Sequence, residues 1–97
     1  MALYTVKARM LDQDGDLVAL QGFETSGMPP GPRRVGEDRF FSIPEVLGMI
    51  EDGDAFDLVF TVVGGRVSGG ELESDGAGWI REKYPLEGSL IADLPTV

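Results

Sequence analysis

The sequence predicts an α+β domain in which one short helix packs on one face of a mainly antiparallel sheet of four to five strands. Three observations predict this class. Residues 42–53 combine helix start and stop signals with apolar residues at helical spacing, and the runs on either side alternate or are continuously apolar, as strands do. Turns rather than helical crossovers join most neighbouring runs. The expected order is strand, strand, helix, strand, strand, strand, in a single domain spanning residues 1–97.

The first two strands are expected at Leu3–Leu11 and Leu17–Phe23. The first alternates between apolar and polar side chains, as a half-buried strand does. A two-residue turn between them would pair Arg9 with Leu20. A three-residue loop with its glycine in the left-handed region would pair Ala8 with Leu20 instead. We favour the second register, because it keeps one face of the hairpin apolar.

Residues 24–39 are predicted to form a long Pro/Gly-rich loop, because six of them are glycine or proline and no periodicity is sustained. A connection of this length in a small domain is usually functional or mobile. Pro29 and Pro32 with Arg33 and Arg34 fit a minimal Pro-x-x-Pro ligand with flanking cations. The alternative is a stiff spacer whose arginines fold back onto the protein's own acids.

The helix is expected at residues 42–52. Ser42 and Glu45 have the spacing of a capping box, and Pro44 falls in the first turn, where its missing N–H leaves no helical bond unmade. Gly53 supplies a left-handed stop. Four aliphatic residues lie at i, i+3, i+4 and i+7 and predict a buried stripe: Ile43, Val46, Leu47 and Ile50.

The second half of the chain predicts a hairpin and a short strand. Ala55–Val63 is the most apolar run and is expected to be a central strand. Gly64–Gly65 permits a tight turn, after which residues 66–73 return. The pair Gly69–Gly70 in the returning strand indicates a bulge or a close approach to the backbone. A short strand is expected within 78–84, and the apolar residues of the tail should dock onto the core.

Composition restricts the chemistry. Cysteine and histidine are absent, which excludes disulfides, thiol nucleophiles, serine triads and ordinary zinc sites. The formal net charge of −9 argues against direct nucleic-acid binding. No apolar run approaches the roughly 18 residues of a membrane span, and the N-terminus has no secretory h-region. We therefore expect a cytoplasmic protein of bacterial or phage type with no membrane partner.

Acidic residues provide the few candidates for chemistry. Asp12, Asp14 and Asp16 alternate like the opening of a calcium loop, but Leu17 stands where the invariant glycine belongs, so a hairpin turn is the better interpretation. Asp57, with Glu71 and Glu73 on the returning strand, could form a carboxylate pair for acid–base work. Acids on the solvent face of an edge strand more often prevent aggregation. We predict no catalytic, cofactor or metal site, and hence no enzyme.

Several segments together resemble a small bacterial domain family of unknown function, domain of unknown function thirty-eight ninety-two. They are the second strand at Leu17–Leu20, the helix from Ser42 to Gly53, the turn Gly64–Arg66, and the late Leu94-Pro95. The resemblance implies an α+β fold and no known activity. The chain departs from that family in its Pro/Gly loop and in having Trp79-Ile80 where the family tends to have Tyr-Leu.

The first functional hypothesis is a non-enzymatic module that binds another protein, a basic one, as an inhibitor or decoy would. The second is a small-molecule-binding domain or minor enzyme, with a pocket under the 24–39 loop containing several of Arg33, Arg34, Asp57 and Trp79. The third is a self-assembling structural subunit, and a strand edge could also form a homodimer. Trp79 is interpreted as a core residue or as a protein contact. The candidate partner-binding residues are Arg33, Arg34, Glu51, Asp52, Asp54, Glu71, Glu73 and Trp79.

Overall fold

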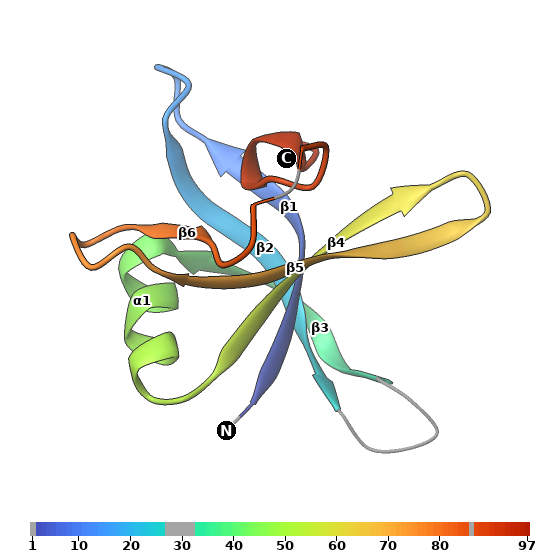
Figure 1. Cartoon of the computed structure of the whole chain (residues 1–97), viewed down its shortest axis with the longest axis horizontal. Helices are drawn as coiled ribbons and strands as arrows, with labels where there is room; N and C mark the ends of the chain where they lie inside the picture. The colour runs from blue at the N-terminus through green and yellow to red at the C-terminus, as the bar shows by residue number, and fades with distance from the viewer. Residues whose placement is uncertain (1, 27–32, 86) are drawn as a thin grey trace.

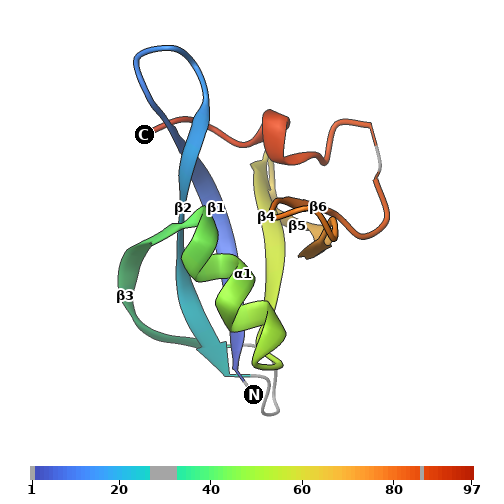
Figure 2. The same ribbon diagram turned by 90° about the vertical axis from the view of Figure 1, so that its left-hand side faces the viewer.

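The computed structural model describes residues 2–26, 33–85 and 87–97 and shows a six-stranded mixed sheet of order β3-β2-β1-β4-β5-β6 (Figure 1). One helix packs on one face of this sheet, as predicted (Figure 2). The elements are β1 (Leu3–Leu11), β2 (Leu17–Ser26), β3 (Arg33–Ser42), α1 (Ile43–Glu51), β4 (Ala55–Val62), β5 (Gly65–Ser74), β6 (Ile80–Glu82) and a 3₁₀ turn, η1 (Ile91–Asp93). Within the described residues, no helix is both long and apolar enough to cross a bilayer.

The prediction of four to five strands was wrong, because the region assigned to a loop at 24–39 contains most of a strand. β2 continues to Ser26, and β3 begins at Arg33 and pairs antiparallel with β2. β3 is an outer strand with largely exposed side chains, so its sequence lacks the apolar alternation that identifies a strand. Residues 27–32, which include the Pro-x-x-Pro pattern, lie outside the described residues.

The described sheet is mainly antiparallel, as predicted, but it is mixed, because β1 and β4 pair in parallel from Leu3–Ala55 to Val6–Leu58. The chain passes from β1 to the outer strand β3, and α1 then returns it so that β4 starts beside the start of β1. A helical connection of this kind is the usual way to join strands that run in the same direction. The Asp54 carboxylate, just before β4, accepts a 2.8 Å hydrogen bond from the Ala2 amide, just before β1. This bond holds the starts of the two parallel strands together.

The favoured β1–β2 register was also wrong. Arg9 pairs with Leu20, the alternative we disfavoured, although Gly15 in the loop has the expected left-handed conformation (φ 85°). The register shifts between Val6 and Ala8, and again near the loop. Each shift inserts an unmatched residue, so counting outward from the turn cannot predict the pairing further along the hairpin.

The helix signals were confirmed in detail. The Ser42 hydroxyl accepts a hydrogen bond from the Glu45 amide at 3.2 Å, and the Glu45 carboxylate accepts one from the Ser42 amide at 3.2 Å. Ile43 and Val46 are buried, while the other two residues of the predicted stripe are partly buried. Gly53 follows the helix with φ 97°, the left-handed stop expected there.

An aromatic cluster forms the centre of the core between α1 and the sheet. The rings of Tyr4 and Phe56 stack with centroids 4.9 Å apart, and Phe41 meets both edge-on at 5.3 and 5.5 Å. These rings come from β1, β4 and the end of β3, so burying them fastens three strands together. The tail docks as predicted, with Ile91 and Leu94 buried against the same core.

Two glycines let β5 bend across the core. The register of β4 and β5 shifts at Gly69, and Gly70 has φ 99°, so the predicted bulge is present. A Cβ on Gly69 would lie 2.3 Å from the Phe60 ring, which shows that the close approach comes from within the chain. Beyond the bend β5 pairs with β6, and Leu72 and Ile80 are buried there.

Candidate functional site

A cleft of about 340 Å³ lies on the face of the sheet that points away from α1. Thr5 and Asp57 alternate along their strands with core residues, so their side chains leave the opposite face. Leu3 and Phe23 supply apolar wall on one side, and residues of the β4–β5 hairpin supply it on the other. Five strands, β1 to β5, therefore contribute to one concave surface.

Arg34 is held rigidly at one end of the cleft. Its guanidinium lies 4.6 Å over the Phe23 ring, its Nε donates to the Gly36 carbonyl at 2.8 Å, and its Nη2 donates to Asp38 at 2.8 Å. The Lys7 ammonium also binds Asp38. The hydrogen bond from Lys7, with the charges of both cations, lowers the pKa of Asp38 below its ordinary value. Two cations thus share one carboxylate.

Asp57 is the carboxylate that lines the cleft. It is half-buried on β4, where Thr5 of β1 is its neighbour on one side and Glu71 of β5 on the other. Burial, and to a lesser extent the charge of Glu71, raises the pKa of Asp57 above its ordinary value. The cross-strand acid pair expected from sequence therefore exists, but Glu71 is bound by Lys83 at 3.1 Å. The arrangement can bind polar groups, and it offers no second free acid beside Asp57 among the described residues.

Arg66 and three hydroxyl groups complete the polar lining. Thr25 donates to the Leu3 carbonyl at 3.2 Å, and the Ser68 hydroxyl accepts from the Gly70 amide at 3.3 Å. The Arg66 side chain is exposed on β5 and makes no hydrogen bond or ion pair with any residue that the structure describes. A second hollow of about 470 Å³ is lined by Ala2, Glu24 and neighbouring residues, with Glu24 the single ionisable group among its described walls.

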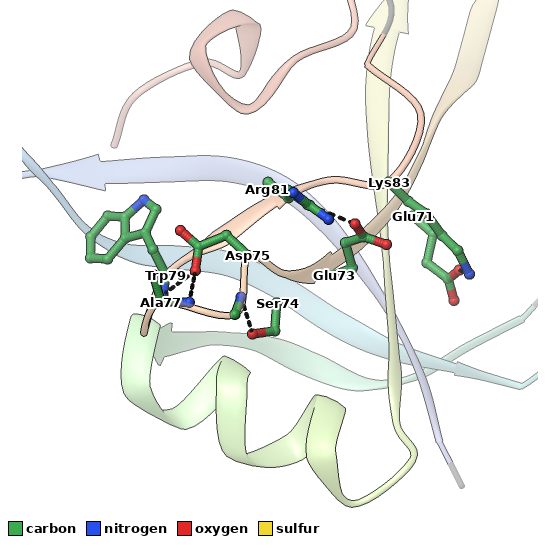
Figure 3. Close-up of polar contacts among 9 residues, drawn as sticks. Glu71, Glu73, Ser74, Asp75, Ala77, Trp79, Arg81 and Lys83 are labelled. Atoms are coloured by element: carbon green, nitrogen blue, oxygen red, sulfur yellow. Dashed lines mark hydrogen bonds and ion pairs between the residues drawn. The ribbon is translucent and has the colours of Figure 1, made fainter.

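Two of the predicted partner-binding acids form ion pairs with cations of the same chain. Glu73 binds Arg81 at 2.7 Å and Glu71 binds Lys83, so the two pairs form a ladder across β5 and β6 (Figure 3). Cross-strand pairs of opposite charge stabilise a sheet. β5 lies between β4 and β6, so these acids are not on an edge strand as the edge-protection interpretation requires. They instead bind Arg81 of β6 and Lys83, which follows it.

The remaining candidate acids lie at the end of α1 and just after it. Asp54 caps the Ala2 amide, whereas Glu51 and Asp52 are exposed where the helix ends. The last turn of α1 carries no basic residue. Negative charge at a helix C-terminus is unfavourable, because the macrodipole is negative there. Glu51 and Asp52 consequently lie where they do not help folding.

Trp79 is not a core residue: 44% of its surface is exposed, and the neighbouring Ile80 is buried instead. It sits in the turn between β5 and β6, where Asp75 accepts hydrogen bonds from the amides of Ala77 and Trp79 at 2.7 and 3.0 Å (Figure 3). These bonds lower the pKa of Asp75 below its ordinary value. The turn that leads into Trp79 is thus held by hydrogen bonds to the Asp75 side chain. The apolar periodicity of the sequence does not reveal such bonds.

The three aspartates of the first loop behave as turn residues. Their carboxylates approach within 4.8 Å of one another, and all are exposed. Asp12 accepts hydrogen bonds from the amides of Asp14 and Asp16 at 2.9 and 3.0 Å. This local bonding is typical of aspartate in tight turns and agrees with the hairpin interpretation.

Two of the four residues expected in a pocket under the 24–39 loop line the cleft. Arg34 and Asp57 line the cleft together, whereas Trp79 does not, and the Arg33 side chain lies outside the described part of the structure. Sequence reasoning missed Phe23 and Arg66 as lining residues. Asp57 was the one lining residue with a local signal in the sequence, because it is an acid that interrupts an apolar run. The other groups meet only through the pairing of distant strands.

No family model matches the chain, and neither a curated protein nor a solved structure was found to be similar to it.

Proposed function

We propose that this chain is a non-enzymatic binding domain that takes a small ligand in the cleft lined by β1 to β5. The observation that supports this function is the joining of apolar walls with convergent polar groups, Arg34, Asp57 and Arg66, in one concavity. Ligand sites are usually concave, largely apolar and equipped with a few placed polar groups. A volume of about 340 Å³ suits a fragment-sized molecule rather than a large cofactor.

Fragment screening by NMR tests this function. Compounds binding in the cleft should shift the amide resonances of residues such as Thr5, Phe23 and Val59. Ser68→Trp places a large side chain at the exposed rim and should abolish those shifts. Val18→Trp, at a partly exposed position that does not line the cleft, is the matched control and should leave binding unchanged. Shifts that map elsewhere, or that persist in Ser68→Trp, would refute the proposal.

A basic protein partner is a second candidate, favoured by the position of Glu51 and Asp52. Both are exposed, make no ion pair with any described residue, and extend the negative end of α1. Carboxylates kept where they oppose the helix dipole would attract a cation from another molecule, as an inhibitor or decoy requires. Self-assembly through β3 has less support, because a register shift and the left-handed Gly36 interrupt that edge.

Binding of a ten-residue lysine peptide tests the acidic candidate. Glu51→Gln with Asp52→Asn should weaken binding several-fold at low ionic strength, since two charges at the contact are removed. Glu37→Gln with Glu87→Gln, two exposed acids in other parts of the chain, is the control for net charge. Affinity that does not fall between about 50 and 300 mM salt, or that falls equally in the control, would refute the idea.

A further inference from the structure

The cleft carries more positive than negative groups, although the whole chain has a net charge of −9. Arg34 and Arg66 line it, and Lys7 lies beside Arg34 through their shared carboxylate. Three carboxylates belong to this face: Asp38, which two cations share; Asp57, whose charged form is disfavoured by burial; and its neighbour Glu71, which Lys83 binds. Arg66 is therefore a cation of the cleft that no described carboxylate neutralises.

The two arginines differ in what they can still bind. Arg34 uses its Nε and Nη2 for Gly36 and Asp38, which fixes the guanidinium against Phe23 and leaves its other N–H groups free. Arg66 has none of its donors engaged by a described residue. A ligand oxygen can thus bind Arg66 without displacing an internal partner. The planar fork of arginine suits a carboxylate or phosphate group better than an isolated neutral oxygen.

We infer that the ligand of this cleft is a small organic anion, with an apolar body against Val59 and Val67 and its anionic group at Arg66. This inference deepens the proposed function and depends on it. Asp57 contributes to selectivity: its neutral form can donate to the ligand, and its ionised form repels an anion. The groups that face Asp57 are Thr5 from β1 and Glu71 from β5, and Lys83 compensates the latter.

Three matched probes separate charge from shape: 2-naphthoate, 2-naphthyl phosphate and the neutral 2-naphthamide. We expect the two anions to bind more tightly than the amide, with NMR shifts centred on the cleft. The tighter of the two anions identifies the anionic group, carboxylate or phosphate. If 2-naphthamide binds as tightly as both anions, the inference of an anionic ligand is wrong and the proposed cleft function stands.

Variants at arginines inside and outside the cleft test the site. Arg66→Gln should weaken 2-naphthoate about tenfold, between the effect of an exposed ion pair and that of a charge-assisted hydrogen bond. It should leave 2-naphthamide unchanged, and Arg66→Lys should restore part of the loss. Arg81→Gln, outside the cleft, should have no effect on either probe. Asp57→Asn should strengthen 2-naphthoate several-fold.

The outcomes distinguish the two proposals. Equal loss of 2-naphthoate affinity in Arg66→Gln and Arg81→Gln would mean a general charge effect and would overturn the inference. Neutral fragments that bind the cleft while neither anion binds would overturn the inference and leave the cleft function intact. No binding by any probe or fragment would overturn both.

Discussion

Replacing Gly22 with alanine tests the packing of the hairpin on which the cleft depends. Gly22 is buried in β2 opposite Val6, and a Cβ there would lie 2.2 Å from the Thr5 carbonyl oxygen. This distance is about 1.2 Å shorter than the 3.4 Å at which ordinary contact begins. Because the obstacle is backbone of the neighbouring strand, no side-chain rotation can relieve it. β1 and β2 would have to separate locally and weaken their hydrogen bonds.

We expect Gly22→Ala to reduce the free energy of unfolding by about 1–3 kcal/mol or more, the usual range for overpacking a core. Gly48→Ala is the matched control, because the same methyl group meets nothing within 4 Å in α1. Alanine should stabilise that helix by about 0.5–1 kcal/mol. For a domain of this size, 1 kcal/mol corresponds to roughly 4–8 °C in Tm.

Urea unfolding followed by circular dichroism measures both variants under the same conditions. The free energy of unfolding should fall in Gly22→Ala and rise in Gly48→Ala, although both variants add the same methyl group. The reasoning would be refuted if Gly22→Ala unfolded at the urea concentration of the wild type, since the Thr5 carbonyl would then be able to move at no cost. A destabilised Gly48→Ala would refute the assignment of that residue to an open helix face.

Three further substitutions examine the helix and the cleft. Ser42→Ala should cost about 0.5–2 kcal/mol in urea unfolding, because the capping box loses its hydroxyl acceptor; an unchanged midpoint would mean that the cap is not needed. Glu51→Lys should stabilise by about 0.3–1 kcal/mol at low salt, since it complements the helix C-terminus, and the gain should shrink in 1 M salt. For Asp57, the pKa is raised on folding, so the folded state holds the proton more tightly and the wild type loses stability as pH rises from the ordinary aspartate pKa through the folded value. Asp57→Asn should remove that loss, matching the wild type in acid and exceeding it near neutral pH; parallel stability–pH curves for the two proteins would contradict this.

Local sequence signals were sufficient to predict those features that depend on residues close together in the chain. The capping box of Ser42 and Glu45 was readable because both partners lie within one turn. The turn at Gly64–Gly65 and the bulge at Gly69–Gly70 were readable because only glycine tolerates such backbones. β3 was missed for the opposite reason. Its pairing energy comes from the backbone of β2, and its exposed side chains carry no apolar pattern.

The candidate site shows the same division. The aspartate at position 57 was conspicuous in sequence because it interrupts an apolar run. Its partners could not be predicted, since Thr5 reaches it only through a parallel pairing that α1 creates. Arg34 was notable as half of a basic pair, but its rigid position over Phe23 depends on the unforeseen strand β3. Trp79 was interpreted as a core residue or as a protein contact, and the structure buries its neighbour Ile80 instead.

By itself, the amino-acid sequence determined the α+β class, the caps of the helix, the turn at Gly64–Gly65, and the exclusion of cysteine and histidine chemistry. Each of these follows from residue type or from spacing within a few positions. Only the tertiary structure decided the strand order, the parallel contact of β1 with β4, and the cleft that five strands line together. Those features arise from burial and backbone pairing between segments far apart in the chain, which local patterns do not encode.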